Sequence, residues 1–238
     1  MSNQYLVIMP TYNEVSNLAN SADEVLRYNP NVDLLIVDDN SPDGTGNLAA
    51  QLAKDDKRIS VLHRTDKQGL GPAYLAGFEY AFSKSYKYVI EMDADGSHRA
   101  ADLVKLILES PTSDLVIGSR WVSGGAVVNW PNYRKAISKF GNFYTRVMLG
   151  TKVRDMTAGY RIYKTELLKR LDLTSIASHG YSFQVEMAWR SIQTGAVVTE
   201  VPITFIERER GVSKMTGSIV VEALWLVTKW GLARLFKS

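Results

Sequence analysis

Tyr88-Val-Ile-Glu-Met-Asp-Ala-Asp95 is the stretch that decides the fold, because its apolar run ends abruptly in two carboxylates. The run predicts a buried strand over 86–92. In an extended chain residues i and i+2 point the same way, so Asp93 and Asp95 are expected to converge. Two convergent carboxylates are costly unless a cation joins them, which favours Mg²⁺ or Mn²⁺ held by oxygen ligands. The alternative is an acidic turn before a helix capped by Ser97.

Working outward from this strand, short apolar runs alternate with helical patterns through the first half of the chain. We expect strands at 5–9, 33–38, 59–63 and 115–118, and helices at 15–28, 46–53, 72–83 and 102–109. Alternation at this spacing indicates βαβ units, so the sequence predicts an α/β fold with a mostly parallel sheet. Right-handed crossovers then place the strand ends, where ligands bind, at one edge of the sheet.

The second half of the chain is less regular. Two glycines and a proline predict a long loop over 121–132. We expect helices at 134–149 and 183–193, strands at 159–163 and 197–206, and a charged loop at 207–215. The chain contains no internal repeat and no low-complexity linker, so 1–238 is predicted to form one domain.

The composition excludes several classes of protein. The chain has no cysteine, which removes disulfides, thiol nucleophiles and thiolate metal sites. A net charge of +3 is too small to indicate a nucleic-acid partner. The charges are nevertheless separated, with nine acids in 1–56 and seven bases but no acid in 120–154. This separation favours one end that handles cations and one that handles anions, although a dipolar surface without a role would look the same.

Membrane-spanning and secretory segments are not expected from the sequence. No run of about 20 apolar residues is present. The N-terminal stretch lacks the basic and long apolar regions of a secretory signal.

Polar groups suited to a nucleoside follow the first two predicted strands. After the first strand, Tyr12 is suited to stack on a base and Glu14 to accept hydrogen bonds from it. The alternative is that Asn13 caps the next helix and Glu14 lies in its first turn. After the second strand, Asp39 is well placed to bind a ribose or base, although its neighbours also form a turn pattern.

Basic groups suited to phosphate occur at two later points. Arg120 closes the strand at 115–118, and arginine is the usual fork for phosphate oxygens. Arg208, Arg210 and Lys214 are expected to neutralise a leaving diphosphate, whereas in isolation their segment would be a solvated loop. The chain has no dinucleotide-binding glycine motif, no Walker A loop and no Gly-x-Ser-x-Gly elbow, which argues against those enzyme classes.

Taken in order, these motifs resemble those of the dolichyl-phosphate mannose synthases, which are inverting glycosyltransferases of family 2. They look most similar to the polyprenol-phosphate mannose synthases of actinobacteria. The resemblance covers about 5–225 and rests on Pro10–Glu14, Asp38–Thr45, Asp93–His98, Gly118–Arg120, Asp155–Arg161 and Val201–Lys214. Trp121 stands where many members have tyrosine, and some members continue into transmembrane helices beyond the final amphipathic segment.

The resemblance implies a GT-A fold, a GDP-mannose donor, a divalent cation and a polyprenyl-phosphate acceptor. The implied product is polyprenyl-phosphate mannose, a lipid-linked mannose donor, formed with inversion. The nucleoside would be bound by Pro10, Tyr12, Glu14, Val37 and Asp39. The ribose, diphosphate and metal would be bound by Asp93, Ala94 and Asp95, and the donor also by Arg120, Arg208 and Lys214. Arg134 and Ser138 resemble positions that take the acceptor phosphate.

Within this scheme, about 1–120 forms the nucleotide-binding part and about 121–238 the acceptor-binding and membrane-facing part. The catalytic groups would be Asp93, Asp95, Arg208 and Lys214, with Asp95 and Asp93 as metal ligands. A phosphate acceptor is already ionised near neutral pH, so a strong general base is unnecessary.

A lipid acceptor implies contact with a membrane, and we expect the protein to be peripheral on the cytoplasmic face. The helix at 134–149 would lie in the interface of an anionic membrane, with 219–236 as a second contact. Its headgroup-facing bases would be Arg134, Lys135, Lys139 and Arg146, and its apolar contacts Ile137, Phe140, Phe143, Tyr144 and Val147. The alternative is that both helices pack on the core or on a membrane-protein partner.

Three other functions remain open at this point. The nearest is a UDP-glucose-dependent polyprenyl-phosphate glucosyltransferase. A nucleotidyltransferase is disfavoured because Thr11–Asn20 has neither glycine nor base. A non-catalytic module that docks on membranes is disfavoured by the Asp93 and Asp95 pair.

Overall fold

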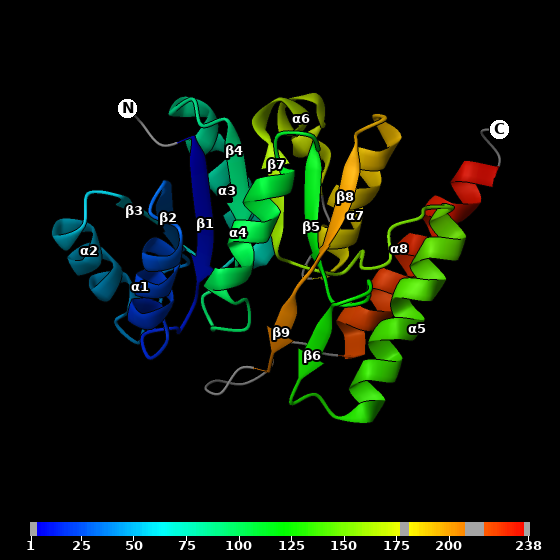
Figure 1. The fold of residues 1–238 in the computed structure, drawn as a ribbon, viewed down its shortest axis with the longest axis horizontal. Coiled ribbons are helices and arrows are strands. Elements are labelled where there is room, and N and C mark those ends of the chain that lie inside the picture. The colour runs from blue at the N-terminus through cyan, green and yellow to red at the C-terminus, as the bar shows by residue number, and fades with distance from the viewer. Residues whose placement is uncertain (1–3, 177–180, 208–216, 236–238) are drawn as a thin grey trace.

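A seven-stranded sheet runs through the molecule, with helices on both faces (Figure 1). The computed structural model describes residues 4–176, 181–207 and 217–235. The first half of the chain contains β1 (Tyr5–Thr11), α1 (Leu18–Tyr28), β2 (Val32–Asp38), α2 (Thr45–Asp55), β3 (Ile59–His63), α3 (Leu70–Ser83), β4 (Tyr88–Glu91), α4 (Ala100–Glu109) and β5 (Leu115–Ser119). This alternation confirms the predicted α/β fold.

The second half adds strands to the sheet and a pair of helices beside it. It contains β6 (Ala126–Val128), α5 (Asn132–Leu149), β7 (Arg161–Lys164), α6 (Thr165–Arg170), α7 (Tyr181–Gln193), β8 (Val198–Pro202), β9 (Thr204–Ile206) and α8 (Gly217–Leu235). The strand order is β3-β2-β1-β4-β7-β5-β8, and the one antiparallel strand among those described is β7, which lies between β4 and β5.

Two apolar layers cover the sheet. One layer packs α1 and α4 on the sheet through residues such as Leu18, Val25 and Leu103. The other layer packs α3, α6 and α7 through residues such as Phe78 and Phe183. The approach of α3 is close, because a Cβ at Gly77 would lie 2.7 Å from side-chain atoms of Ile8 on β1.

Two predicted segments of the second half differ from the structure. The loop expected over 121–132 contains β6, and the single strand expected over 197–206 is divided into β8 and β9. β8 pairs with β5, whereas β9 pairs with β6 in a separate two-stranded sheet. The division falls at Ile203, whose N–H donates to Ser119 O (3.1 Å) and whose carbonyl accepts from Ala126 N–H (2.9 Å). One extended segment therefore serves both sheets.

α5 and α8 lie side by side at one end of the sheet (Figure 1). The Tyr144 and Thr228 hydroxyls lie 2.6 Å apart across this contact, and the Tyr144 ring packs against the core. Tyr144 is therefore not an exposed apolar contact, because α8 covers it. Apolar side chains that remain exposed are Tyr133, Ile137, Phe140, Phe143 and Val147 on α5, and Leu224, Trp225 and Leu232 on α8. Within the described ranges, no helix is both long and apolar enough to cross a bilayer.

Candidate active site

The carboxyl ends of β1, β2, β4 and β5 lie at one edge of the sheet, as expected for parallel strands. Because β7 is antiparallel, the segment that precedes it reaches the same edge. Pro10 on β1 and Val37 on β2 are register partners there. The residues that the sequence singled out thus arrive from both halves of the chain.

Asp93 and Asp95 lie on a turn beyond β4. The strand ends at Glu91, so the expectation that both aspartates extend from a strand over 86–92 is wrong. Asp95 Oδ1 accepts the Ser97 N–H (3.0 Å), Gly96 takes a φ of +76°, and the Ser21 hydroxyl donates to Ala94 O (2.8 Å). Ser97 does not cap the next helix, which begins at Ala100. The Asp93 side chain is 35% exposed, so the turn presents it to solvent.

His98 supports this turn from below. Its Nδ1 accepts the Asp93 N–H (3.1 Å), and its ring stacks on Tyr160 with 4.7 Å between centroids. Burial lowers the pKa of His98, which keeps the imidazole neutral and leaves Nδ1 as an acceptor. Phe205 meets the His98 ring edge-on, and Trp130 in turn meets Phe205. The sequence analysis did not single out Tyr160, Phe205 or Trp130 as site residues.

Arg120 is held in a buried salt bridge. Its Nε and Nη2 donate to Asp155 at 2.8 and 2.7 Å, and its backbone N–H donates to the same carboxylate at 2.9 Å. Burial alone would raise the pKa of Asp155, but the Arg120 guanidinium and its hydrogen bonds hold that pKa below the usual value. Sequence reasoning missed Asp155 as this partner. The predicted donor-binding role of Arg120 stays a prediction.

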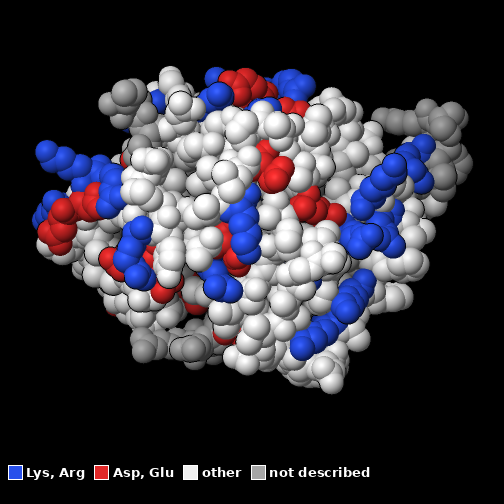
Figure 2. All heavy atoms as spheres, viewed as in Figure 1, with Lys and Arg blue, Asp and Glu red and all other residues white. Residues whose placement is uncertain are grey.

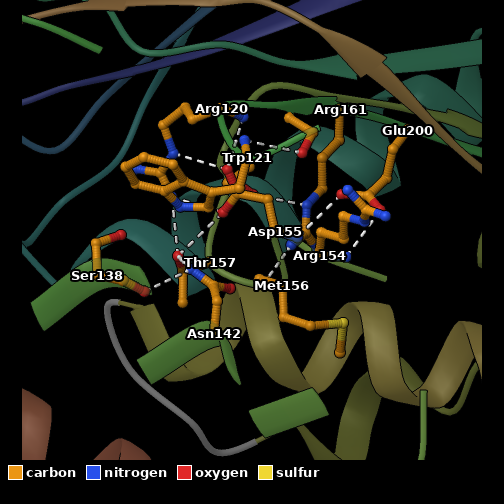
Figure 3. Close-up of polar contacts among 12 residues, drawn as sticks. Arg120, Trp121, Ser138, Asn142, Arg154, Asp155, Met156, Thr157, Arg161 and Glu200 are labelled. Atoms are coloured by element: carbon orange, nitrogen blue, oxygen red, sulfur yellow. Dashed lines mark hydrogen bonds and ion pairs between the residues drawn. The ribbon is translucent and has the colours of Figure 1, made fainter. Parts of the chain in front are cut away.

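A chain of hydrogen bonds connects Arg120 to α5 (Figure 3). Arg120 Nη2 donates to Thr157 Oγ1 (2.9 Å), and Asn142 Nδ2 donates to the same oxygen (3.1 Å). Asn142 also donates to the backbone carbonyl of Ser138 at 3.0 Å. The structure thereby brings two predicted site residues, Arg120 and Ser138, into one polar network.

Arg134, at the start of α5, lies against Trp130, the aromatic residue that contacts Phe205. Its guanidinium lies 4.1 Å from the centroid of Trp130, and the Arg120 guanidinium lies 5.5 Å from that centroid. Arg134 also forms an ion pair with Glu207, and its side chain is 16% exposed. The expectation that Arg134 faces headgroups with the other bases of α5 is therefore wrong.

The β1 exit holds Tyr12 and Glu14 outside the next helix. α1 begins at Leu18, so the alternative in which Asn13 caps that helix and Glu14 lies in its first turn is wrong. Asn13 has a φ of +59°, and buried Glu14 accepts a hydrogen bond from Asn17 Nδ2 (2.9 Å). The Lys67 ammonium lies 4.0 Å from the centroid of the Tyr12 ring.

Asp39 is buried at the β2 exit and already has partners. Arg64 Nη1 donates to one oxygen at 2.6 Å, and the backbone N–H groups of Gln68 and Gly69 donate to the other at 3.3 Å. Sequence reasoning missed Arg64 and Lys67, although both are cations in the loop that follows β3. Arg208, Arg210 and Lys214 lie outside the described residues.

A cavity of about 580 Å³ opens beside Asp95. Its walls come from α1, the start of α4 and the end of β9, and they include Asn20, Glu24 and Arg99. Tyr12, Glu14 and Asp39 do not line it. Sequence reasoning missed these residues, because polar side chains at such spacing are common on the exposed face of any helix.

Glu91 lies fully buried at the end of β4. Neither carboxylate oxygen has a hydrogen-bond partner of ordinary geometry in the described part of the chain, although the Gln184 side chain lies close enough to favour the ionised form. Burial raises its pKa to about 7, and the nearby Arg161 opposes that rise. A carboxyl group that is only partly ionised at neutral pH therefore lies two residues before Asp93.

A sheet of this order, with two aspartates on the turn after β4, is the α/β arrangement of the GT-A fold. The class of enzyme follows from the family to which the sequence belongs. Residues 6–172 match the model of Glycosyl transferase family 2, and the chain belongs to that family.

Two curated relatives resemble the chain over almost its whole length. An undecaprenyl-phosphate mannosyltransferase of Micrococcus luteus is 51% identical over 96% of this chain and 94% of its own. A polyprenol monophosphomannose synthase of Mycolicibacterium smegmatis is 51% identical over 95% of this chain and 86% of its own.

Two solved structures share the fold at low identity. Mannosyltransferase PcManGT from Pyrobaculum calidifontis, in complex with GDP-Man and Mn²⁺, aligns with a TM-score of 0.63 and 17% identity over 99% of this chain and 64% of that one. Glucosyl-3-phosphoglycerate synthase from Mycobacterium tuberculosis, in complex with Mn²⁺ and UDP-Glc, aligns with a TM-score of 0.69 and 16% identity over 98% and 79%.

Proposed function

We propose that this chain transfers mannose from GDP-mannose to the phosphate of a polyprenol, with inversion, to give polyprenyl-phosphate mannose. The observation that carries the proposal is the 51% identity, over 96% of the chain, to a relative named undecaprenyl-phosphate mannosyltransferase. GDP-mannose as the donor is supported by the fold neighbour whose complex contains GDP-Man.

The Asp93–Asp95 turn fits a divalent cation, Mg²⁺ or Mn²⁺. It offers carboxylate oxygens at the sheet edge, and no group of three acids, histidines or cysteines suited to a metal occurs in the described ranges. Two carboxylates suffice for Mg²⁺ when substrate phosphates complete its shell. A cation bound there would offset charge on the departing diphosphate. Arg208 and Lys214 are proposed to contact the same diphosphate.

The chain's own residues would hold the nucleoside and the acceptor. Tyr12, Glu14 and Asp39, with Pro10 and Val37 beside them, are proposed to surround the nucleoside, and Ala94 to contact the ribose. The acceptor phosphate is ionised at neutral pH, because a phosphate monoester has a second pKa near 6. No base is then needed, which agrees with His98 being buried and neutral beneath the turn.

Arg134 and Ser138 are proposed to bind the acceptor phosphate. Both lie on α5, close to the network that contains Arg120. The Arg134 guanidinium forms an ion pair with Glu207, so the acceptor phosphate would compete with that carboxylate for the guanidinium.

We also propose that α5 and α8 contact an anionic membrane. Their exposed apolar side chains lie next to Lys135, Lys139 and Arg146 of α5. Each base near an anionic surface is worth about 1 kcal/mol, so three give reversible binding together with the apolar contact. A membrane-protein partner on the same helices is the competing possibility. Wild-type protein should float with anionic liposomes and lose binding as salt rises.

Transfer of radiolabelled mannose from GDP-mannose into an organic phase, with and without divalent cation, tests the function. Asp95→Ala should lose activity by orders of magnitude while remaining folded. The matched control is Asp23→Ala, which removes an exposed aspartate of α1 and should keep full activity. Near-normal turnover by Asp95→Ala would refute the metal assignment. Transfer of glucose from UDP-glucose instead would identify the alternative enzyme, and lipid binding without turnover would indicate a docking module.

Calorimetry tests the nucleoside site separately. GDP should bind more tightly than UDP, and Tyr12→Ala should weaken GDP binding by removing a stacking surface. Equal affinity for the two nucleotides would count against GDP-mannose as the donor.

A further inference from the structure

The loop between β3 and α3, residues 64–69, places a cation on each of two groups that are proposed to bind the nucleoside. The Lys67 ammonium lies 4.0 Å from the centroid of the Tyr12 ring. Arg64 Nη1 donates to Asp39 Oδ1 at 2.6 Å. The ring on which the base would stack and the carboxylate that would bind the nucleoside are therefore both in contact with side chains of one short loop.

The contact between Arg64 and Asp39 is the firmer of the two. It is a buried ion pair, with side chains 14% and 5% exposed. The other Asp39 oxygen accepts the backbone N–H groups of Gln68 and Gly69 at 3.3 Å, which fixes the backbone of the loop. Removing one partner of a buried pair shifts a stability equilibrium by more than about a hundredfold. This end of the loop should therefore stay in place when a nucleotide binds.

The contact between Lys67 and Tyr12 is much weaker. Lys67 is exposed, and within the described ranges no carboxylate forms an ion pair with it. An exposed contact between a cation and an aromatic ring changes an equilibrium by about two- to fivefold. Stacking of a nucleic-acid base on an aromatic ring is worth about five- to 150-fold. A base that stacks on this ring should therefore displace the ammonium.

A displaced Lys67 ammonium has the donor diphosphate within reach. Tyr12 and the Asp93–Asp95 turn follow β1 and β4, which are neighbouring strands with a spacing of about 5 Å. Lysine carries its charge on a flexible four-carbon stem, so a movement of about one strand spacing brings the ammonium from the ring towards phosphates held at that turn.

The surroundings favour a single cation over a broad positive surface. Figure 2 shows acidic and basic side chains intermixed over the part of the molecule that contains β2, β3 and α2, whereas those in a column over α5 are basic. The first 56 residues carry nine acids. A diphosphate in this half of the molecule therefore depends on individual cations that can turn towards it.

We propose that Lys67 is a donor-binding residue that exchanges one partner for another. Its ammonium lies on the Tyr12 ring until the base of the donor stacks there, and it then binds an oxygen of the diphosphate. Asp39 holds the backbone of the loop throughout. The exchange rests on the nucleoside role proposed for Tyr12 and adds a cation that the sequence did not single out. A nucleoside without phosphates has to displace the ammonium and gains nothing from it.

Nucleosides and nucleotides separate the two steps, and NMR titrations of the ¹⁵N-labelled full chain, without metal or acceptor, measure both affinities. Lys67→Ala should strengthen guanosine binding about two- to fivefold, because the base no longer displaces a cation. The same variant should weaken GDP binding at least tenfold, because the diphosphate loses a charged hydrogen bond. Lys67→Arg should bring GDP affinity back to within about threefold of wild type.

The matched control is Lys87→Ala. The Lys87 ammonium also lies over a tyrosine, 5.3 Å from the centroid of the Tyr88 ring. Tyr88 begins β4, so this pair is at the opposite edge of the sheet from Tyr12. Neither the guanosine nor the GDP affinity should change by more than about 1.5-fold.

The ε-methylene signal of Lys67, in the chain labelled with ¹³C-lysine and assigned with Lys67→Arg, follows the exchange directly. The Tyr12 ring should shift this signal upfield in the protein without nucleotide, and saturating guanosine should remove that shift. Unchanged guanosine affinity in Lys67→Ala, or a signal that stays shifted, would show that the base does not take the place of the ammonium. Unchanged GDP affinity would show that the ammonium does not bind the diphosphate.

Uridine and UDP provide the same comparison for the alternative donor. If wild type binds UDP more tightly than GDP, the proposed donor is wrong, but opposite effects of Lys67→Ala on uridine and UDP would still support the exchange. If wild type binds GDP as proposed and Lys67→Ala changes neither guanosine nor GDP binding, the exchange alone is overturned. Absence of binding of either nucleotide would overturn both.

Discussion

Replacing Glu91 by glutamine should raise the free energy of unfolding at alkaline pH and leave it almost unchanged at acid pH. The Glu91 carboxyl is fully buried at the end of β4, and among the described residues it has no hydrogen bond of ordinary geometry, with only the Gln184 side chain nearby to favour its charge. Burial raises its pKa from 4.5 to about 7, even with Arg161 nearby. Glutamine keeps the shape of the side chain and removes the charge.

The size of the effect comes from this difference in pKa. A carboxyl with a higher pKa in the folded protein binds its proton more tightly there, so the free energy of unfolding falls as pH rises from 4.5 towards 7. At about 1.4 kcal/mol for each pH unit, the wild type loses about 3 kcal/mol across that range. The substituted glutamine does not titrate, so the variant should gain up to about 3 kcal/mol over wild type between pH 5 and pH 8.5.

Urea unfolding followed by circular dichroism at pH 5, 6, 7 and 8.5 measures this difference. His98 also contributes, because its lowered pKa reduces stability as pH falls below about 6.5, but both proteins share that term and it cancels. Glu109→Gln, on the exposed face of α4, is the control and should show a flat difference. A flat difference for the Glu91 variant, or lower stability at pH 8.5, would show that Glu91 ionises at an ordinary pKa and is paired.

Three further changes test other contacts. Asp155→Asn should lower the free energy of unfolding by about 3–5 kcal/mol in urea titrations, because it leaves the Arg120 guanidinium buried without its counter-charge; a loss below 1 kcal/mol would contradict the buried pair. Gly77→Ala should lower the free energy of unfolding by about 1–3 kcal/mol, because the new methyl group overlaps Ile8 of β1; the higher helix propensity of alanine offsets about 1 kcal/mol of this loss. Gly141→Ala is the control and should raise the free energy of unfolding, because the space around its Cβ is open. Glu207→Gln should lower KM for the lipid acceptor with little change in kcat, because its arginine partner is released; an unchanged KM would show that this arginine does not bind the acceptor.

The first half of the fold was predictable because each strand is an apolar run bounded by helical patterns. β1, β2 and β3 therefore appear within two residues of their expected bounds. The direction of β7 was not predictable, because its four residues contain no pattern that distinguishes parallel from antiparallel pairing with β4 and β5. β6 and β9 are three residues each and pair across 70 or more positions, so no local pattern marks them.

The candidate site was predictable only in its residue types. The change from apolar residues to Asp93 and Asp95 marks the end of β4 in the sequence itself. The sequence could not show that Arg120 already has a counter-ion, because Asp155 lies 35 positions away. In the same way, Tyr144 was expected among the apolar membrane contacts of this helix, and only the position of α8 shows that it is covered.

The position of β7 has a consequence for synthesis of the chain. β5 is paired only with β7 and β8 within the main sheet, and both strands come from the second half. A nascent chain that has just emerged through β5 therefore has a sheet that stops at β4 and a fifth strand with no neighbour. About 45 more residues must be made before β7 is complete and can pair with β4, which takes on the order of a few seconds. During that interval the open edge of β4 is a point for misassembly. Fragments divided at residue 120 should accordingly fail to fold separately, because the cut parts β5 from both of its neighbours in the sheet.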